Sequence, residues 1–405
     1  MKEGWEYKKL GEVIEHLRTG LNPRTHFKLN TPDAEGYYVT VRELKGFSIE
    51  PDEKTDKVNR AAIKRINERS NLKIGDVLFS GTGTIGKTAL VSELPENWNI
   101  KEGVYAMTPK HSELDSKYFI YYIGSDLFLR LVNDKAAGTG VRSIPMKELV
   151  KLPITIPPLS EQQSIVDYLD SAFAKIDAMK ANAEKALGEA KALFQASLKE
   201  MLEPKEGWEE KKLGDIVSFF SGYAFESKRY TNNNDDILLI CGDNIVHCDF
   251  RWETIKHWPK EEYDDLKRFS LEKNDIVLAM DRPWVKSGLK IAKITPKELP
   301  SLLIQRTACI RAPKDISSDF VFYALQTEKF IKHLVSLQNG VGVPHISGKQ
   351  ILSYKISIPK YVEQQSIVAT LDSLRFKVDR LQANYAKISQ ECDALKQAIL
   401  RQVFE

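Results

Sequence analysis

The stretch Lys2-Glu3-Gly4-Trp5-Glu6 is written a second time as Lys205-Glu206-Gly207-Trp208-Glu209. Glu161-Gln162-Gln163-Ser164-Ile165-Val166 likewise returns as Glu363-Gln364-Gln365-Ser366-Ile367-Val368. The two separations, 203 and 202 positions, are each half of the 405-residue chain to within a residue. Several matches in one order at one separation indicate an internal repeat. The repeat predicts a pseudo-two-fold molecule, with a simple tandem repeat lacking functional symmetry as the alternative.

Composition narrows the class of protein. A length of 405 residues suits two or three domains, and 42% hydrophobic against 28% charged residues predicts packed cores. The net charge of +3 is too balanced for a protein that coats nucleic acid, but it leaves room for local basic faces. No apolar run is long enough to span a membrane, and the first residues lack the apolar core of a secretion signal. The four cysteines are predicted to be reduced thiols, and the expected location is cytoplasmic.

The end of each half is predicted to be a long helix, because its apolar residues alternate at spacings of four and three. Two such helices that follow related domains are expected to pair antiparallel and to hold the domains at opposite ends. The alternative is that each apolar stripe packs only on its own domain. The predicted helix–helix interface consists of Ile165, Leu169, Ile176, Met179 and Leu193 in the first helix, and of Ile367, Leu371, Leu374, Val378, Leu381, Ile388, Leu395 and Ile399 in the second.

The variable blocks are predicted to be mixed α/β domains that share one fold. Short apolar runs at 36–41, 75–80 and 274–279 are typical of strands, and helical segments are expected at 116–133 and 318–337. The fold class is therefore α/β (α+β), with two similar domains separated by an antiparallel two-helix coiled coil. The predicted bounds are 1–155 and 204–357 for the domains, and 156–203 and 358–405 for the helices.

The ordered set of motifs resembles the specificity subunits of type I restriction–modification systems, over essentially the whole chain. Its marks are Gly4-Trp5 with Leu10-Gly11, Gly75-Asp76-Val77-Leu78, Gly83-Thr84-Ile85-Gly86-Lys87, Gly138-Thr139-Gly140, Ile154-Thr155-Ile156-Pro157-Pro158 and Glu161-Gln162-Gln163. The second half departs from this pattern, because Asp281-Arg282-Pro283-Trp284-Val285-Lys286-Ser287 replaces the Gly-Thr-Ile-Gly-Lys motif.

The resemblance implies two target-recognition domains that each read one half of a split site in double-stranded DNA. It implies spacer helices that set the gap between the half-sites and dock two modification (methyltransferase) subunits, with restriction subunits joining the complex. The chain itself is expected to be non-catalytic and to hold no cofactor or metal, whereas S-adenosylmethionine, ATP and magnesium are expected on the partner subunits. No membrane association is expected.

Two other functions compete with this interpretation. Gly81-Thr82-Gly83-Thr84-Ile85-Gly86-Lys87-Thr88 fits the phosphate-binding loop of an NTPase, but such a loop must be followed by a helix, and the following segment is stopped by Pro95. A coiled-coil scaffold with two protein-binding domains is the other alternative. The sequence favours a Gly/Thr hairpin that approaches DNA phosphate.

Candidate DNA contacts are polar or basic residues in loops that follow predicted strands or the Gly-rich segments. Arginine, lysine and asparagine suit base edges and phosphates, although each of these residues is also common in ordinary solvated loops. The candidates are Arg42, Thr82, Thr84, Lys87, Thr139, Arg142 and Ser143 in the first half, and Asn244, Arg282, Lys286, Ser287 and His345 in the second. No catalytic constellation and no zinc-type spacing of cysteines and histidines is apparent.

Overall fold

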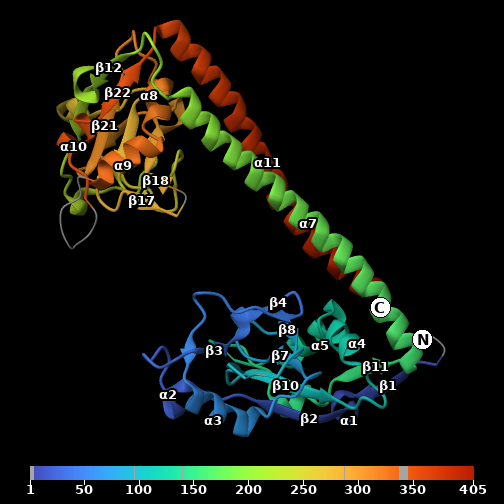
Figure 1. Cartoon of the computed structure of the whole chain (residues 1–405). Helices are drawn as coiled ribbons and strands as arrows, with labels where there is room; N and C mark the ends of the chain where they lie inside the picture. Colours follow the sequence, from blue (N-terminus) through green and yellow to red (C-terminus); the bar gives the residue numbers. More distant parts are fainter. Residues whose placement is uncertain (1–3, 95, 139, 287, 337–344) are drawn as a thin grey trace. The chain divides into compact units, whose positions relative to one another are not determined.

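The chain forms two compact units, each containing one domain and parts of both long helices (Figure 1). The structure is a computed structural model that describes residues 4–94, 96–138, 140–286, 288–336 and 345–405. The first unit comprises Met1–Glu184 and Tyr385–Glu405, and the second comprises Lys185–Asn384. Within the described residues, no helix is long and apolar enough to cross a membrane.

The first domain is built on a four-stranded antiparallel sheet in the order β2-β10-β7-β8. A second sheet has the order β6-β3-β9, in which β3 and β9 run parallel, and β1 pairs antiparallel with β11. The strands are β1 (Glu6–Lys9), β2 (Ile14–Thr19), β3 (Gly36–Val39), β4 (Leu44–Lys45), β5 (Ser48–Ile49), β6 (Lys57–Val58), β7 (Val77–Ser80), β8 (Thr88–Leu90), β9 (Trp98–Ile100), β10 (Val104–Pro109) and β11 (Pro153–Ile156). The helices are α1 (Leu10–Val13), α2 (Pro23–His26), the 3-10 helix η1 (Val41–Glu43), α3 (Arg60–Ser70), α4 (Ser116–Ile123), α5 (Asp126–Lys135) and α6 (Met146–Leu149).

The second domain repeats this topology. Its sheets have the orders β13-β21-β16-β19 and β15-β14-β20, with β14 and β20 parallel, and β12 pairs antiparallel with β22. The strands are β12 (Glu209–Lys212), β13 (Ser218–Ser221), β14 (Ile237–Ile240), β15 (His257–Trp258), β16 (Ile276–Ala279), β17 (Trp284–Val285), β18 (Gly288–Leu289), β19 (Ile291–Lys293), β20 (Ser301–Leu303), β21 (Thr307–Arg311) and β22 (Lys355–Ile358). The helices are η2 (Leu213–Asp215), η3 (Ser227–Arg229), η4 (Lys260–Glu262), η5 (Asp264–Phe269), η6 (Pro296–Glu298), α8 (Ser318–Ala324), α9 (Glu328–Ser336) and α10 (Gly348–Leu352).

Both faces of the central sheet are buried, which explains the unbroken apolar runs of its inner strands. In β7, Val77 and Phe79 pack with the helices α4 and α5, whereas Leu78 packs with the second sheet. In β16, Ile276 and Leu278 face the helices and Val277 faces the second sheet. The mixed α/β fold predicted for both halves is therefore confirmed.

The helical segments expected at 116–133 and 318–337 are each two helices rather than one, and residue 337 lies outside the described residues. In the first domain, α4 ends at Ile123 with Gly124 as its C-cap, and the Ser125 hydroxyl then accepts a hydrogen bond from the Phe128 N–H as the N-cap of α5. A serine in this role satisfies an N–H that a new helix would otherwise leave open, so it begins a second helix.

The repeated sequence motifs meet where each domain joins its long helix, α7 (Leu159–Met201) or α11 (Tyr361–Phe404). The Trp5 indole N–H donates to Glu161 at 2.9 Å, and that of Trp208 donates to Glu363 at 3.1 Å. Gln162 is fully buried, and it accepts a hydrogen bond from the Asp115 N–H and donates to the Glu113 and Pro157 carbonyls. Buried polar groups need such partners, so these motifs specify the junction between domain and helix.

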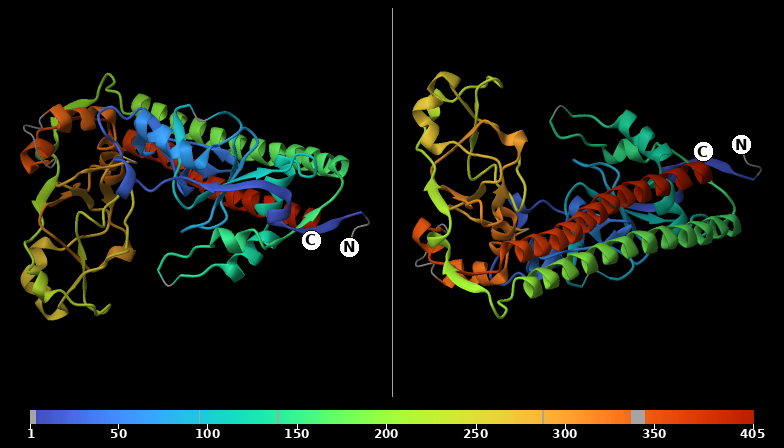
Figure 2. Two further views of the ribbon diagram at one scale, coloured as in Figure 1. Left: turned by 90° about the horizontal axis from the view of Figure 1, so that it is seen from below. Right: turned by 90° about the horizontal axis from the view of Figure 1, so that it is seen from above.

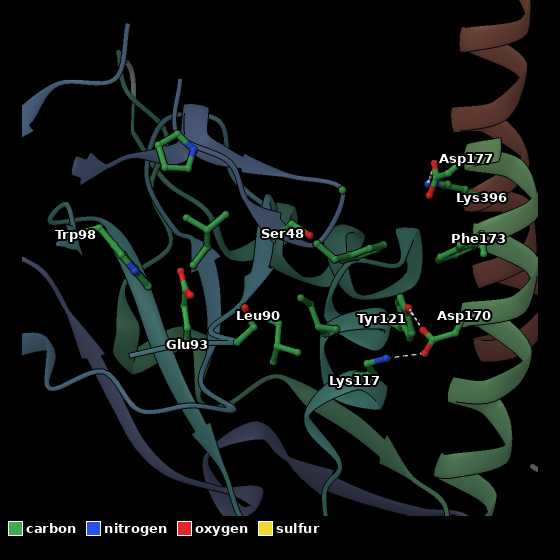
Figure 3. A pocket seen from close by; sticks show the side chains of 17 residues that line it. Ser48, Leu90, Glu93, Trp98, Lys117, Tyr121, Asp170, Phe173, Asp177 and Lys396 are labelled. Carbon is green, nitrogen blue, oxygen red and sulfur yellow. Dashed lines mark hydrogen bonds and ion pairs between the residues drawn. The ribbon is translucent and has the colours of Figure 1, made fainter. Parts of the chain in front are cut away.

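A cavity of about 450 Å³ lies between the first domain and the helices of the same unit (Figure 3). Lys117 and Tyr121 of α4 both donate to Asp170 of α7, the former at 2.6 Å. Burial acts to raise the pKa of Asp170, but these two hydrogen bonds outweigh it and lower the pKa below its ordinary value. The second domain repeats the contact, because the Tyr323 hydroxyl donates to Asp372 at 2.6 Å.

The long helices pair antiparallel within each unit. In the first unit, Lys396 near the end of α11 is ion-paired at 2.6 Å with Asp177 in the first half of α7 (Figure 3). The ribbon views show α7 and α11 side by side (Figure 2). In the second unit, Phe194 near the end of α7 shares a core with Leu371 near the beginning of α11. The antiparallel pairing expected from the sequence is thus present in each unit.

The seam of α7 is the line of its residues that are buried along the helix pair. At every second position along this line, the buried residue is the neighbour of the predicted one. Leu169 and Ile176 are buried and Ile165 is half-buried, but Met179 and Leu193 are exposed. The buried residues are instead Val166, Phe173, Leu187 and Phe194. Adjacent pairs such as Ala186-Leu187 and Leu193-Phe194 permit either register, and the observed one buries the larger side chain, which removes more apolar area from water. The assignment of Met179 and Leu193 to the interface was therefore wrong.

The seam of α11 follows the predicted residues more closely. Ile367, Leu371 and Val378 are buried, and Leu374, Leu381, Ile388 and Ile399 are half-buried. Leu395 is exposed, and Lys396 takes its place facing α7. An α-helix turns once in 3.6 residues and so drifts away from a strict 3.5-residue repeat, which moves the seam by one position near the end. The assignment of Leu395 to the interface was therefore also wrong.

This corrected seam predicts unequal effects for one substitution made at two places in α7. Leu187 is 8% exposed and Leu193 is 58% exposed. Leu187→Ala is expected to lower the free energy of unfolding by about 2 kcal/mol because it leaves a cavity. Leu193→Ala is expected to change it by less than about 0.5 kcal/mol. Urea denaturation of the full chain measures both values, and equal losses would contradict the corrected seam.

Candidate nucleic-acid interface

The Gly/Thr segment 81–87 of the first domain is a tight loop between the antiparallel strands β7 and β8. The Gly86 N–H donates to the Ser80 carbonyl at 3.0 Å, and the Lys87 N–H donates to the Ser80 hydroxyl at 2.8 Å. Lys87 is followed directly by a strand, whereas an NTPase phosphate loop needs a helix whose N-terminus holds the phosphates. The alternative of a phosphate-binding NTPase loop is therefore wrong.

Three of the predicted DNA contacts, Arg42, Thr84 and Lys87, line one open cleft of about 810 Å³ in the first unit. Lys45 and Lys396 line the same cleft, together with one carboxylate, Asp393. The lining thus has four cationic side chains against one acidic side chain. An excess of lysine and arginine in a cleft attracts the phosphates of nucleic acid.

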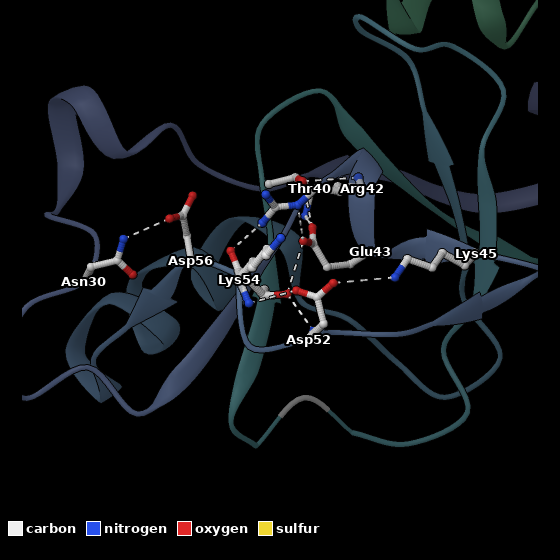
Figure 4. Close-up of polar contacts among 9 residues, drawn as sticks. Asn30, Thr40, Arg42, Glu43, Lys45, Asp52, Lys54 and Asp56 are labelled. Atoms are coloured by element: carbon white, nitrogen blue, oxygen red, sulfur yellow. Dashed lines mark hydrogen bonds and ion pairs between the residues drawn. The ribbon is translucent and has the colours of Figure 1, made fainter. Parts of the chain in front are cut away.

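Hydrogen bonds with Glu43 and with the Lys54 carbonyl hold the Arg42 side chain in place (Figure 4). Its Nε–H donates to Glu43 at 3.0 Å, and an Nη2–H donates to the Lys54 carbonyl at 2.7 Å. Glu43 is buried and also accepts from the Thr40 N–H and hydroxyl, which completes the capping box at the N-cap Thr40 of η1. The hydrogen bond with Glu43 raises the pKa of the Arg42 guanidinium. The guanidinium is more than half exposed, which leaves its remaining N–H groups available to a ligand.

Thr82, Arg142 and Ser143 lie at the other flank of the same loop. The Thr82 and Ser143 hydroxyls are 3.1 Å apart, and the Gly83 N–H donates to the Arg142 carbonyl at 2.9 Å. The Arg142 guanidinium donates to the Asn133 carbonyl at 2.9 Å. The structure therefore brings six of the seven first-half candidates to one loop and its surroundings. The seventh, Thr139, lies outside the described residues.

The hydrogen bonds of the two central sheets define equivalent positions in the two domains. Gly81 N–H donates to the Gly103 carbonyl at 2.8 Å, and Met280 N–H donates to the Arg306 carbonyl at 2.9 Å. The next residue forms the same isolated bridge in each domain, between Thr82 and Ser143 and between Asp281 and His345. The following residues, Gly83 and Arg282, are therefore equivalent as well.

The same register makes Lys290 the counterpart of Lys87. The Ser80 N–H donates to the Lys87 carbonyl, and the Ala279 N–H donates to the Lys290 carbonyl, each just before the strand that follows. The loop of the second domain is longer, because the hairpin formed by β17 and β18 is inserted into it. Lys286, a predicted DNA contact in the segment that replaces the Gly-Thr-Ile-Gly-Lys motif, is an exposed residue in the turn of that hairpin. Ser287 lies outside the described residues.

Asn244 is fully buried, which contradicts its predicted contact with DNA. Its carbonyl oxygen accepts from the Cys241 N–H at 3.3 Å, and its amide donates to the Arg251 and Thr254 carbonyls. It follows β14 as Glu43 follows β3, and it fastens the turn in the same way. An amide whose hydrogen-bonding groups are occupied inside the domain cannot read a base edge.

Arg282 and His345, by contrast, line one pocket of about 620 Å³ in the second domain. Between them lies Asp281, which is 2.5 Å from His345 Nδ1 and 2.7 Å from Arg306 Nη1. Burial acts to raise the pKa of Asp281, but these two hydrogen bonds outweigh it and lower the pKa. The pocket is also lined by residues that were not among the predicted DNA contacts, namely Tyr230, Asp243, Lys256, Lys290, Gln305 and Arg306.

Most of each half matches one family model, the type I restriction modification DNA specificity domain, at residues 2–187 and 205–390. The chain belongs to this family. A specificity subunit of the type I restriction enzyme MjaVIII from Methanocaldococcus jannaschii is 27% identical over 92% of this chain and 86% of its own length. The EcoAI specificity subunit of Escherichia coli is 36% identical over 42% of this chain and 28% of its own length.

Solved structures of the same kind share the fold of this specificity-family chain. A chain from a study of complex assembly and conformational transition of the type I R-M system superposes with a TM-score of 0.72 at 17% identity, covering 100% of this chain and 98% of the other. The HsdS subunit of Thermoanaerobacter tengcongensis superposes with a TM-score of 0.52 at 18% identity, covering 100% and 97%. At these identities the likeness establishes the fold.

Membership of a DNA specificity family assigns this chain to recognition rather than to catalysis. The loops that join β7 to β8 and β16 to β19 are then the candidate reading surfaces of the two domains. A sequence signal for the missed Lys290 was present, because Lys87-Thr88-Ala89 and Lys290-Ile291-Ala292 align at the starts of matching strands. Matching the strands rather than the Gly-rich motif would have found it.

Proposed function

We propose that the chain is the non-catalytic DNA-recognition subunit of a type I restriction–modification enzyme, in which each domain reads one half of a bipartite site in double-stranded DNA. The long helices set the gap between the half-sites and dock two modification subunits, and restriction subunits complete the complex. Methyl transfer and ATP-dependent cleavage, with S-adenosylmethionine, ATP and magnesium, belong to these partners. The complex acts in the cytoplasm, where the DNA of a bacterial or archaeal cell lies.

One observation carries the proposal: two domains of one fold present different side chains at equivalent loop positions. Thr82 corresponds to Asp281, Gly83 to Arg282, and Gly103 to Arg306. Each base pair presents its own pattern of hydrogen-bond donors and acceptors in the major groove. Two domains that share a fold but differ in their loop side chains are therefore suited to read two different short sequences. A protein-binding scaffold would not need two domains of the same fold with different polar residues at equivalent positions. The family match does not favour a scaffold either.

Exchange of one domain tests the proposal. The second domain, residues 204–357, is replaced by the corresponding domain of a specificity subunit that recognises a different half-site, and the chimera is assembled with modification subunits. Mapping of methylated adenines is expected to show one changed half-site and one unchanged half-site. The reciprocal exchange of residues 1–155 serves as the control and is expected to change the other half. Simultaneous change of both half-sites, or of neither, would contradict the modular reading.

A further inference from the structure

Lys290 is largely buried, which is unusual for a lysine. Its side chain is 8% exposed and lines the pocket at the end of β16. Within the described part of the chain, its ammonium group has neither a hydrogen bond nor an ion pair. Burial lowers its pKa, although the Asp243 carboxylate acts in the opposite direction. The largely buried side chain thus presents an ammonium group without a partner in the described chain to the pocket, which favours a ligand that accepts hydrogen bonds and carries negative charge.

Two arginines at the same pocket occupy backbone positions that the first domain gives to glycine. Arg282 has a φ of 44° and Arg306 has a φ of 63°, whereas their counterparts Gly83 and Gly103 have φ values of 79° and 91°. Residues other than glycine rarely adopt a positive φ, because their Cβ atom then crowds the backbone. The second domain therefore accepts backbone strain twice in places where glycine would have been free of it. Strain of this kind is concentrated at functional sites.

The charges at the pocket favour an anion. Four cationic side chains line it, Lys256, Arg282, Lys290 and Arg306, against the carboxylates of Asp243 and Asp281. Asp281 is already hydrogen-bonded by Arg306 and His345. Among the described residues that line the pocket, the cationic side chains therefore outnumber the carboxylates.

The depth of Lys290 decides between the two anionic or acceptor-rich parts of DNA. Base edges lie at the floor of a groove that is about 8.5 Å deep in B-DNA, so a side chain must protrude in order to read them. A recessed lysine cannot reach so far, whereas a phosphate protrudes from the duplex and can enter a pocket.

On these grounds, we propose that this pocket of the second domain binds a single phosphate group of the DNA backbone, with Lys290 as its innermost contact and Arg282 and Arg306 at its rim. The inference rests on the proposed function and adds an asymmetry to it. The second domain binds a phosphate of the DNA backbone in a pocket, whereas Lys87, the counterpart of Lys290 in the first domain, is exposed.

Two variants and one control test the inference in the full chain assembled with its modification subunits. Lys290→Met keeps the apolar stem and removes the charge, and Arg282→Gly restores the residue of the first domain. Lys273→Met is the matched control, because Lys273 is exposed and precedes β16 at the strand end remote from the pocket. The affinity for the recognised duplex and for random duplexes is measured over a range of salt concentrations.

For Lys290→Met, the slope of log K against log salt is expected to become shallower by about 0.9, the value for one phosphate contact. The affinity is expected to fall several-fold by the same factor on recognised and random DNA, because a phosphate contact carries no sequence information. The melting temperature of the chain is expected to be unchanged or higher in both variants, since one removes a charge that lacks a partner in the described chain and the other relieves a strained backbone. Lys273→Met is expected to leave the salt slope and the affinity for both kinds of DNA unchanged.

Three results would overturn the inference. One is an unchanged salt slope in Lys290→Met, while the wild-type complex binds DNA normally. Another is a loss confined to one base pair of the recognised sequence, which would mean a base contact. If the wild-type complex bound no DNA, the proposed function would fail, and inorganic phosphate would then test the pocket alone. Phosphate is expected to raise the melting temperature of the wild-type chain more than that of Lys290→Met, and an equal rise would overturn the anion site as well.

Discussion

Adding one heptad to each long helix is expected to lengthen the gap between the two recognised half-sites by about three base pairs. Seven helical residues add about 10 Å at 1.5 Å per residue, and successive base pairs are about 3.4 Å apart. The insertions belong after Glu184 in α7 and after Asn384 in α11, at the boundary between the two compact units. A heptad returns the helix to nearly the same face, so the apolar seam continues through the insertion.

The effect on the original site is expected to be large, because the two domains can no longer engage both half-sites at once. Affinity for that site should fall toward the affinity for random DNA, a loss of about 10³-fold or more. Selection of bound duplexes from a pool with varied gaps measures the new preference. Insertion of seven residues after Asn232, in an exposed loop of the second domain, is the matched control and should leave the gap unchanged. An unchanged preference in the heptad variant would rule out the spacer role of the helices.

Asp275→Ala is expected to destabilise the second domain by about 2–3 kcal/mol, because it removes a buried carboxylate and its two hydrogen bonds with the charged Arg311 guanidinium. Asp275 is 1% exposed, and Arg311 donates to both of its carboxylate oxygens at 2.7 Å. The hydrogen bond and charge of Asp275 raise the pKa of the Arg311 guanidinium. In the variant, the Arg311 guanidinium would keep, of its described hydrogen bonds, only those with Glu272 and the Ser270 carbonyl.

Glu272→Ala provides the matched control, because Glu272 contacts the same arginine at 2.7 Å but is largely exposed. Exposed ion pairs contribute about 0–1 kcal/mol, so the control is expected to be close to wild type. Urea denaturation followed by circular dichroism measures both variants. Similar losses for the two would show that the buried pair is not what holds this end of the sheet. Asp76 of the first domain is also buried and paired, with Arg18 at 3.2 Å.

Much of the fold was predictable because the chain is a repeat. Two copies of one pattern restrict each other: any fold inferred for the first half must also suit the second. The motifs that mark the repeat, Gly4-Trp5 and Glu161-Gln162-Gln163 among them, are the ones that form the junction of domain and helix. Their residue types follow from burial of polar groups, which permits few substitutions.

The candidate site was predictable only in part. Arg42, Thr84 and Lys87 do meet at one cleft, because the segment after β3 and the loop between β7 and β8 both line it. Asn244 was misassigned because an amide that fastens a turn and an amide that contacts DNA have the same appearance in sequence. Lys290 was missed because the inserted hairpin of β17 and β18 displaced the motif comparison.

The sequence by itself determined the duplication, the mixed α/β domains and the two long helices, because periodicity and repetition are properties of residue order alone. Only the tertiary structure decided which side chains of α7 face its partner and which residues of the two domains are equivalent. An adjacent pair such as Leu193-Phe194 satisfies the helical period in either register, and packing chooses the one that buries more apolar surface. The counterpart of Lys87 is likewise defined by the hydrogen bonds between strands, which join residues far apart in the chain.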